Sequence, residues 1–308
     1  MKKYLIILLI LGISISSKSR SLNKISNSIN TEYQEIINDN YELSKPIGKI
    51  NAVLILFGGF SENATAIKRE FPIIDKAKKK NIAILYMNFN RKLWINENEK
   101  SELSELLQKI FKENQLPSDN VYIGGFSSGG NLCLLISNHL VKEKRRIQPK
   151  GVFIIDSPVD LLALYHLYER NIERNFSKSS VNEANWLLNI FNKELGNPKD
   201  GIRKFEESSP FISESNYIGN VSNLNNLKIR FYTEPDTLWW KTNRQNTPED
   251  LNAFSIEKLI TELEKKFNNE KVELIKTENK GYRSNGNRHP HSWSIVDKDN
   301  LINWMIQE

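Results

Sequence analysis

The chain has 308 residues, and 39% of them are hydrophobic, which is enough to bury a sizeable core. No Pro/Gly/Ser-rich linker and no internal repeat interrupts the middle of the sequence, which favours one large domain over two. The formal net charge of +6 is spread along the chain. Its densest run, from Lys142 to Lys150, has no interleaved aromatic residues, so we expect a solvated loop there and no nucleic-acid partner.

The first residues have the pattern of a secretory signal peptide. A basic start, residues 1–3, precedes the apolar stretch Tyr4–Ile15, and small serine residues follow. An uncleaved anchor is the competing interpretation, but the apolar stretch is shorter than the ~20 residues that a membrane span needs. We therefore predict a signal peptide at 1–17, cleavage near 16–19, and a secreted or periplasmic protein with no stable membrane span in the mature chain.

Residues 18–40 are polar and weakly patterned, and we expect a loose N-terminal segment there, with a first strand around 41–50. Residues 51–57 form a continuous apolar run, which is typical of a strand that is buried on both faces. This run ends at Gly58-Gly59-Phe60, where the pattern predicts a tight turn.

Strand and helix patterns then alternate along the chain, which predicts an α/β fold with a doubly wound, mostly parallel sheet. The helical region 64–79 is broken by Pro72. The further expected strands lie at 82–88, 121–126, 151–155, 228–233 and 272–275, and the further expected helices at 103–111, 131–140, 256–267 and 301–305. We assign residues 41–308 to this domain.

Residues 161–227 separate two of these strands, where a plain connection takes about 2–6 residues. This segment contains helical patterns, and we interpret it as a helical cap inserted over the site. Its aromatic residues could line a substrate pocket or form the core of the cap itself. They are Tyr165, Tyr168, Trp186 and Phe191.

A Gly-x-Ser-x-Gly motif stands between the expected strand 121–126 and the expected helix 131–140. Gly125 and Gly129 flank Ser127 at two residues on each side. Glycines at these places let neighbouring backbone approach without a Cβ clash. Cys133, the only cysteine, lies on the apolar helix and is expected to be a packed thiol, and a single cysteine excludes an intramolecular disulfide.

The motif in this strand–turn–helix setting resembles the nucleophile elbow of the α/β-hydrolase superfamily, near esterases and prolyl-oligopeptidase-like serine hydrolases. No motif ties the chain to one subfamily. The resemblance covers about residues 41–308. It implies that the turn after the first buried strand presents an oxyanion donor, the backbone N–H of Phe60 or Gly59, and that the N–H of Ser128 is the second donor.

A serine hydroxyl needs an imidazole as general base and a carboxylate that orients it. His289 and His291 lie in a polar loop before the last helix, where the family places its histidine. We prefer His291, because His291-Ser292-Trp293 resembles the His-x-aromatic pattern found there, and His289 is the alternative. A His-Pro-His pair could also bind a metal, but no matching cluster accompanies it, so we expect no metal and no cofactor.

The family order of Ser, then Asp or Glu, then His implies an acid between the elbow and the histidine loop. Asp236 is our choice because it closely follows the strand 228–233. Glu234 is an alternative at the same loop, and Asp156 or Asp160, after the preceding strand, would serve a less common arrangement. Any of these could instead be a turn residue or a helix cap.

The resemblance therefore implies a serine hydrolase that cleaves a carboxylic ester or an amide through an acyl-enzyme, and the N-terminal pattern predicts that it is exported. The expected partner is a small ester or a short peptide. Two alternatives remain open: a non-catalytic binding protein on the same scaffold, and an acyltransferase with the same triad, since a fold alone does not determine function.

Overall fold

The computed structural model of the protein describes residues 32–307, except for Asn90 and 268–270. The predicted signal peptide lies outside the described residues, as does most of the expected polar N-terminal segment. Within the described part of the chain, no helix is both long and apolar enough to cross a membrane.

An eight-stranded sheet runs through this part of the chain in the order β1-β2-β4-β3-β5-β6-β7-β8. Strand β2 pairs antiparallel with both β1 and β4. All other neighbours in the sheet, from β4 through β3 to β8, pair in parallel. The predicted doubly wound, mostly parallel sheet is confirmed. The strands are β1 (Tyr33–Ile37), β2 (Tyr41–Pro46), β3 (Ala52–Phe57), β4 (Ile82–Met87), β5 (Val121–Phe126), β6 (Pro149–Ile155), β7 (Lys228–Thr233) and β8 (Val272–Lys276).

Strand β1 lies where the sequence predicts a loose polar segment, and this prediction is wrong for Tyr33–Ile37. Within the described sheet the strand pairs only with β2, at the edge, and all of its residues are exposed or half-buried. An edge strand of this kind carries no continuous apolar run, so hydrophobic patterning does not detect it.

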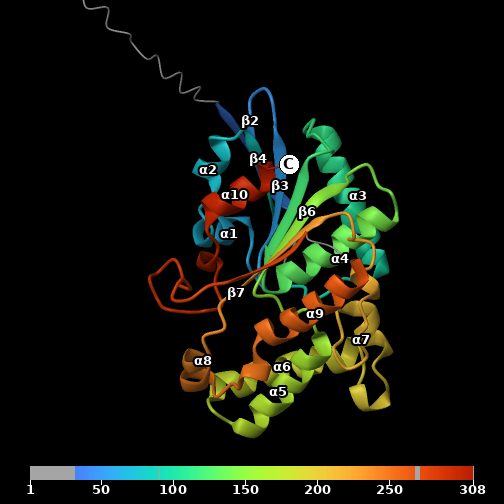
Figure 1. Ribbon diagram of the computed structural model, residues 1–308, viewed down its shortest axis with the longest axis vertical. Helices are drawn as coiled ribbons and strands as arrows, with labels where there is room; N and C mark the ends of the chain where they lie inside the picture. Colours follow the sequence, from blue (N-terminus) through green and yellow to red (C-terminus); the bar gives the residue numbers. More distant parts are fainter. Residues whose placement is uncertain (1–31, 90, 268–270, 308) are drawn as a thin grey trace, which may run out of the picture. The chain divides into compact units, whose positions relative to one another are not determined.

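Helices cover both faces of the sheet because alternate residues of each central strand point to opposite sides. On β3, Val53, Ile55 and Phe57 belong to one buried cluster, and the residues between them belong to the other. The first cluster includes α3 (Glu97–Glu113), α4 (Ser128–Lys142) and α9 (Asn252–Phe267), and the second includes α1 (Ala64–Glu70), α2 (Ile74–Lys78) and α10 (Lys298–Ile306) (Figure 1).

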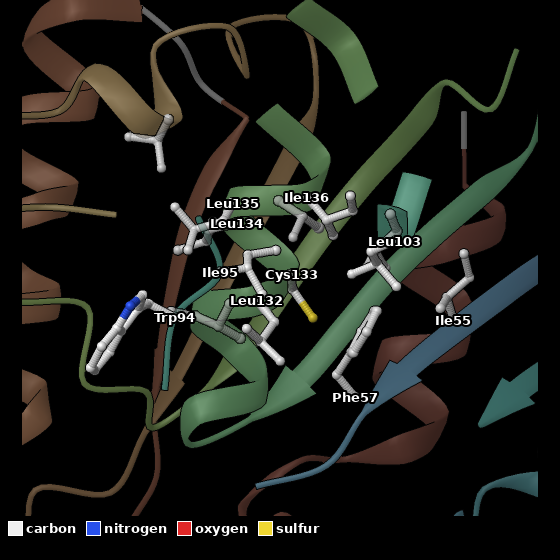
Figure 2. Packing of buried hydrophobic residues seen from close by; sticks show 14 of the residues in the cluster. Ile55, Phe57, Trp94, Ile95, Leu103, Leu132, Cys133, Leu134, Leu135 and Ile136 are labelled. Carbon is white, nitrogen blue, oxygen red and sulfur yellow. The ribbon is translucent and has the colours of Figure 1, made fainter. Parts of the chain in front are cut away.

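Helix α4 is buried along nearly its whole length. Figure 2 shows side chains of this helix, from Leu132 to Ile136, packed beside Phe57 of β3 and Leu103 of α3. Cys133 is among them, and burial raises the pKa of its thiol well above the usual value. This packing fixes the start of α4, and hence the turn that precedes it, against the sheet.

Between β6 and β7 the chain forms α5 (Leu161–Arg174), α6 (Lys178–Glu194) and α7 (Arg203–Ser208), and after β7 it forms α8 (Thr237–Arg244). Figure 1 shows these helices gathered beyond one end of the sheet, the end at which β6 and β7 run into them. The segment 161–227, expected as a helical cap, contains the first three.

Candidate active site

Ser127 occupies the sharp turn between β5 and α4. Its backbone has φ 54° and ψ −128°, a strained conformation that L-residues rarely adopt. From Val121 to Leu140, Ser127 is the one residue that is not fully buried. The turn therefore holds a single hydroxyl at the surface of an otherwise buried strand and helix.

The glycines of the motif are required by close backbone contacts. A Cβ on Gly129 would lie 2.3 Å from the carbonyl oxygen of Gly58 and 2.5 Å from that of Phe57. A Cβ on Gly125 would lie 2.5 Å from the carbonyl oxygen of Gly129. Real Cβ atoms do not approach so closely, so the start of α4 meets the turn after β3 only because these side chains are absent.

That contact brings together the turn after β3 and the elbow, from which the sequence predicts the oxyanion donors. The N–H of Gly59 donates to Glu62 Oε2 at 2.8 Å, so Gly59 is not available as a donor to substrate, contrary to one of our expectations. Within the residues that the structure describes, neither Phe60 N–H nor Ser128 N–H makes a hydrogen bond. These two N–H groups are the candidates for binding an oxyanion.

His291 pairs with Asp156. Its Nδ1 lies 2.5 Å from Oδ2 of Asp156, which directly follows β6 in a left-handed backbone conformation with φ 45°. The His291 ring lies 4.4 Å from the ring of Phe126, the residue before Ser127. The carboxylate fixes one ring nitrogen as the hydrogen-bond donor and leaves Nε2 as the atom that can accept a proton.

Asp236, our choice for the acid, does not contact His291. Its Oδ1 accepts the backbone N–H of Trp239 at 2.9 Å, which caps α8, and its Oδ2 pairs with Arg288 at 2.7 Å. The structure therefore does not bring Asp236 to His291, and the carboxylate that pairs with His291 is Asp156, which we considered only as an alternative.

Glu234 anchors the loop that carries the histidines. This buried carboxylate accepts the hydroxyl of Thr277 at 2.9 Å and the backbone N–H groups of Lys280 at 2.8 Å and Gly281 at 3.1 Å. It also pairs with Arg288 at 2.7 Å. Its bonds go to the loop and not to His291.

Asp160 is a structural residue. It caps α5 by accepting the N–H of Ala163 at 2.9 Å, and it accepts the N–H of Ser213 at 2.8 Å.

His289 faces the same cavity as His291 without contacting a carboxylate. Its ring lies 4.7 Å from the ring of Trp239 and 6.3 Å from that of His291. Burial, aided by the positive charges of Arg283 and Arg244, lowers its pKa to about 3. It is therefore neutral at physiological pH, and its Nδ1 has no hydrogen-bond partner in the described part of the chain.

Ser127, Asp156 and His291 line one cavity of about 340 Å³. Phe60 lines it from the turn after β3, and α5 and α6 contribute residues such as Tyr168 and Trp186. Part of the expected cap thus lies over the candidate triad. Two expected cap aromatics, Tyr165 and Phe191, instead pack against each other and against Phe205.

Glu62 is a site residue that the sequence did not indicate. Its Oε2 accepts the N–H of Gly59 at 2.8 Å and Nε1 of Trp293 at 3.0 Å. One carboxylate therefore joins the oxyanion turn to the loop of His291. A lone Glu three residues after a glycine pair carries no signal for this role, because its second partner is more than two hundred residues away.

The described residues contain no group of three or more His, Cys, Asp or Glu side chains that could hold a metal ion. The chemistry available to the site is that of a serine hydroxyl, an imidazole paired with a carboxylate, and two backbone donors. Together these groups can carry out nucleophilic attack on a carbonyl with transfer of a proton.

Comparison with known proteins supports the same class of fold. No protein-family model matches the sequence, and no curated protein matches it with significance. Solved structures do match, and together with the arrangement of sheet and helices they show that the protein has the α/β-hydrolase fold.

One similar structure is the fluorophosphonate-binding serine hydrolase F of Staphylococcus aureus, with 12% identity, a TM-score of 0.51, and coverage of 90% of this chain and 99% of that one. A second is an esterase of Rhizomucor miehei, with 15% identity, a TM-score of 0.53, and coverage of 89% and 81%. A third is carboxyl esterase 2 of Tuber melanosporum, with 12% identity, a TM-score of 0.52, and coverage of 92% and 86%. Identities this low show the fold alone.

Proposed function

We propose that the protein is a serine hydrolase that cleaves a carboxylic ester through an acyl-enzyme, with Ser127 as nucleophile, His291 as general base and Asp156 as its orienting carboxylate. One observation carries the proposal: a serine in strained elbow geometry shares a cavity with a histidine whose Nδ1 is 2.5 Å from a carboxylate. The esterases with a similar fold add support.

In the proposed mechanism, Ser127 Oγ attacks the substrate carbonyl while His291 Nε2 accepts the hydroxyl proton. The negative charge of Asp156 stabilises the imidazolium that forms. The N–H groups of Phe60 and Ser128 donate to the oxyanion, and a donor of this kind contributes about 10²- to 10³-fold in rate. His291 then returns the proton to the leaving alcohol. In the second half of the reaction, water attacks the acyl-enzyme while His291 accepts its proton, and the carboxylic acid leaves as the proton returns to Ser127 Oγ.

Labelling with a fluorophosphonate tests the proposal directly, because the reagent forms a covalent bond with an activated serine. We expect the wild-type protein to be labelled and Ser127→Ala not to be. Ser157→Ala is a suitable control, because Ser157 is fully buried. Equal labelling of wild type and Ser127→Ala would contradict the assignment.

We further propose that the enzyme is exported after removal of residues 1–17. The basic start and apolar stretch of the sequence support this proposal. Intact-mass measurement on protein from the native host tests it. A mature protein that still begins at Met1 and fractionates with membranes would favour an anchor instead.

A further inference from the structure

Two arginines line the cavity of Ser127 without an ion-pair partner in the described part of the chain. Arg283 lies in the histidine loop, and Arg244 lies at the end of α8. Both side chains are only partly exposed. Arginine is seldom removed from water unless its charge is paired, so an unpaired cation in a cavity needs an explanation.

The carboxylates that line the cavity have other partners. Asp156 pairs with His291, and Glu234 pairs with Arg288. Asp250 pairs with Arg170 and Arg174, each at 2.7 Å.

The fourth carboxylate that lines the cavity, Glu183, is exposed on α6. None of these four carboxylates forms an ion pair with Arg283 or Arg244 in the described part of the chain.

Arg283 and His291 both lie beside the ring of Phe126. Its guanidinium carbon is 5.6 Å from the centre of the Phe126 ring, and that ring is 4.4 Å from the ring of His291. Burial lowers the pKa of Arg283, while the negative charges of Glu62 and Glu70 act in the opposite direction. Oε2 of Glu62 accepts from Gly59 and Trp293, and no ion pair joins Glu62 to Arg283 among the described residues.

Arg244 extends the positive charge along the cavity. It lines the same cavity as Arg283 and His289, and the charges of both arginines help to lower the pKa of His289. A guanidinium presents several N–H donors in one plane and binds carboxylate or phosphate oxygens strongly.

We propose that the substrate is an ester that carries a second, anionic group, a carboxylate or a phosphate, and that Arg283 and Arg244 bind this group. This inference rests on the proposed esterase function. Aromatic residues that line the same cavity, such as Trp186 and Trp240, would contact the uncharged part of the substrate. The arginines would thus select esters with a negative charge at a set distance from the scissile carbonyl.

Two matched pairs of substrates test this proposal. The mono-p-nitrophenyl ester of glutaric acid is compared with its methyl-capped neutral form, which places the charge on the acyl side. Butyryl glycerol phosphate is compared with monobutyrin, which places it on the alcohol side. We expect kcat/KM for the anionic member of one pair to exceed that of the neutral member by about tenfold or more, as expected for a charge-assisted hydrogen bond in a partly desolvated site.

Arg283→Met and Arg244→Met should each lower this ratio about tenfold, because methionine keeps much of the length but loses the charge. Arg283→Lys should restore part of the preference. Arg203→Met is the control for net charge, since Arg203 is exposed on α7, outside the cavity, and is paired with Glu207. It should leave the ratio unchanged.

Calorimetry on the Ser127→Ala protein separates this proposal from the function on which it rests. Without the nucleophile, the glutarate ester should bind more tightly than its methyl-capped form, and Arg283→Met should remove the difference. If the anionic ester binds more tightly in this way but the wild-type protein does not hydrolyse it, only the esterase assignment is overturned. Turnover with equal preference for both members of both pairs would overturn the role of the arginines alone.

Discussion

The pairing of His291 with Asp156, and not with Asp236, can be tested by replacing each carboxylate with an amide. Asp156→Asn keeps the size of the side chain but removes its negative charge from a site 2.5 Å from His291 Nδ1. The imidazolium that forms during catalysis would lose its compensating charge, and the ring could adopt the wrong tautomer. In serine hydrolases this change lowers kcat by about 10⁴-fold, which corresponds to roughly 5.4 kcal/mol.

Asp236→Asn is the matched control, because it makes the same chemical change one strand away. Asparagine caps a helix about as well as aspartate, so the start of α8 should be kept. Arg288 keeps its second carboxylate, Glu234, at 2.7 Å. We expect kcat to fall by no more than about fivefold, since a partly exposed ion pair contributes at most about 1 kcal/mol.

The assay is hydrolysis of p-nitrophenyl butyrate by both variants, with thermal unfolding measured on the same samples. Both proteins should unfold cooperatively near the wild-type temperature, so that a change in kcat reports chemistry. The reverse ranking, with Asp236→Asn inactive and Asp156→Asn near wild type, would refute the pairing and return the acid to the loop after β7.

Three further changes separate the roles of the other site residues. His291→Ala should lose nearly as much activity as Ser127→Ala, and the double variant should lose little more, because triad members act as a unit; additive losses would contradict this. His289 has a lowered pKa of about 3, so its neutral form stabilises the protein at pH 7, and this contribution is lost as the pH falls from about 6.5 towards 3. His289→Gln should therefore flatten the dependence of the urea unfolding free energy on pH between 4 and 6.5, and an unchanged slope would argue against a buried neutral ring. Glu62→Gln should lower kcat about 10- to 100-fold with little change in KM, because it loosens the turn that presents Phe60 N–H; a pure rise in KM would show that the turn binds substrate equally in the ground state.

The sequence predicts most of the sheet because its central strands are buried on both faces. Such strands appear as apolar runs, and residues 51–57 and 82–88 correspond closely to β3 and β4. The elbow is also predictable, because Gly125 and Gly129 are required by contacts of the backbone itself. Strand β1 is not, because its stability comes from pairing with β2 and not from its own pattern.

The identity of the acid could not be predicted in the same way. Asp156 follows β6 and Asp236 follows β7, and these strands are parallel neighbours, so both carboxylates lie at the same edge of the sheet. Which of the two carboxylates meets His291 depends on the path of the long loop that leads from the end of β8 to His291. That path is determined by contacts between distant segments, such as the bond of Glu62 to Trp293, which local sequence does not encode.

The contacts of Glu234, the carboxylate after β7, support the proposed position of the acid after β6. Glu234 accepts the N–H groups of Lys280 and Gly281 and pairs with Arg288, so it holds both ends of the loop segment that precedes His291. A buried carboxylate with these partners is fully satisfied and is not free to orient an imidazole. Fixing the loop at this point leaves His291 to meet the next carboxylate along the sheet edge, which is Asp156. Glu234, after β7, thus holds the loop, and Asp156, after β6, bonds the ring of His291.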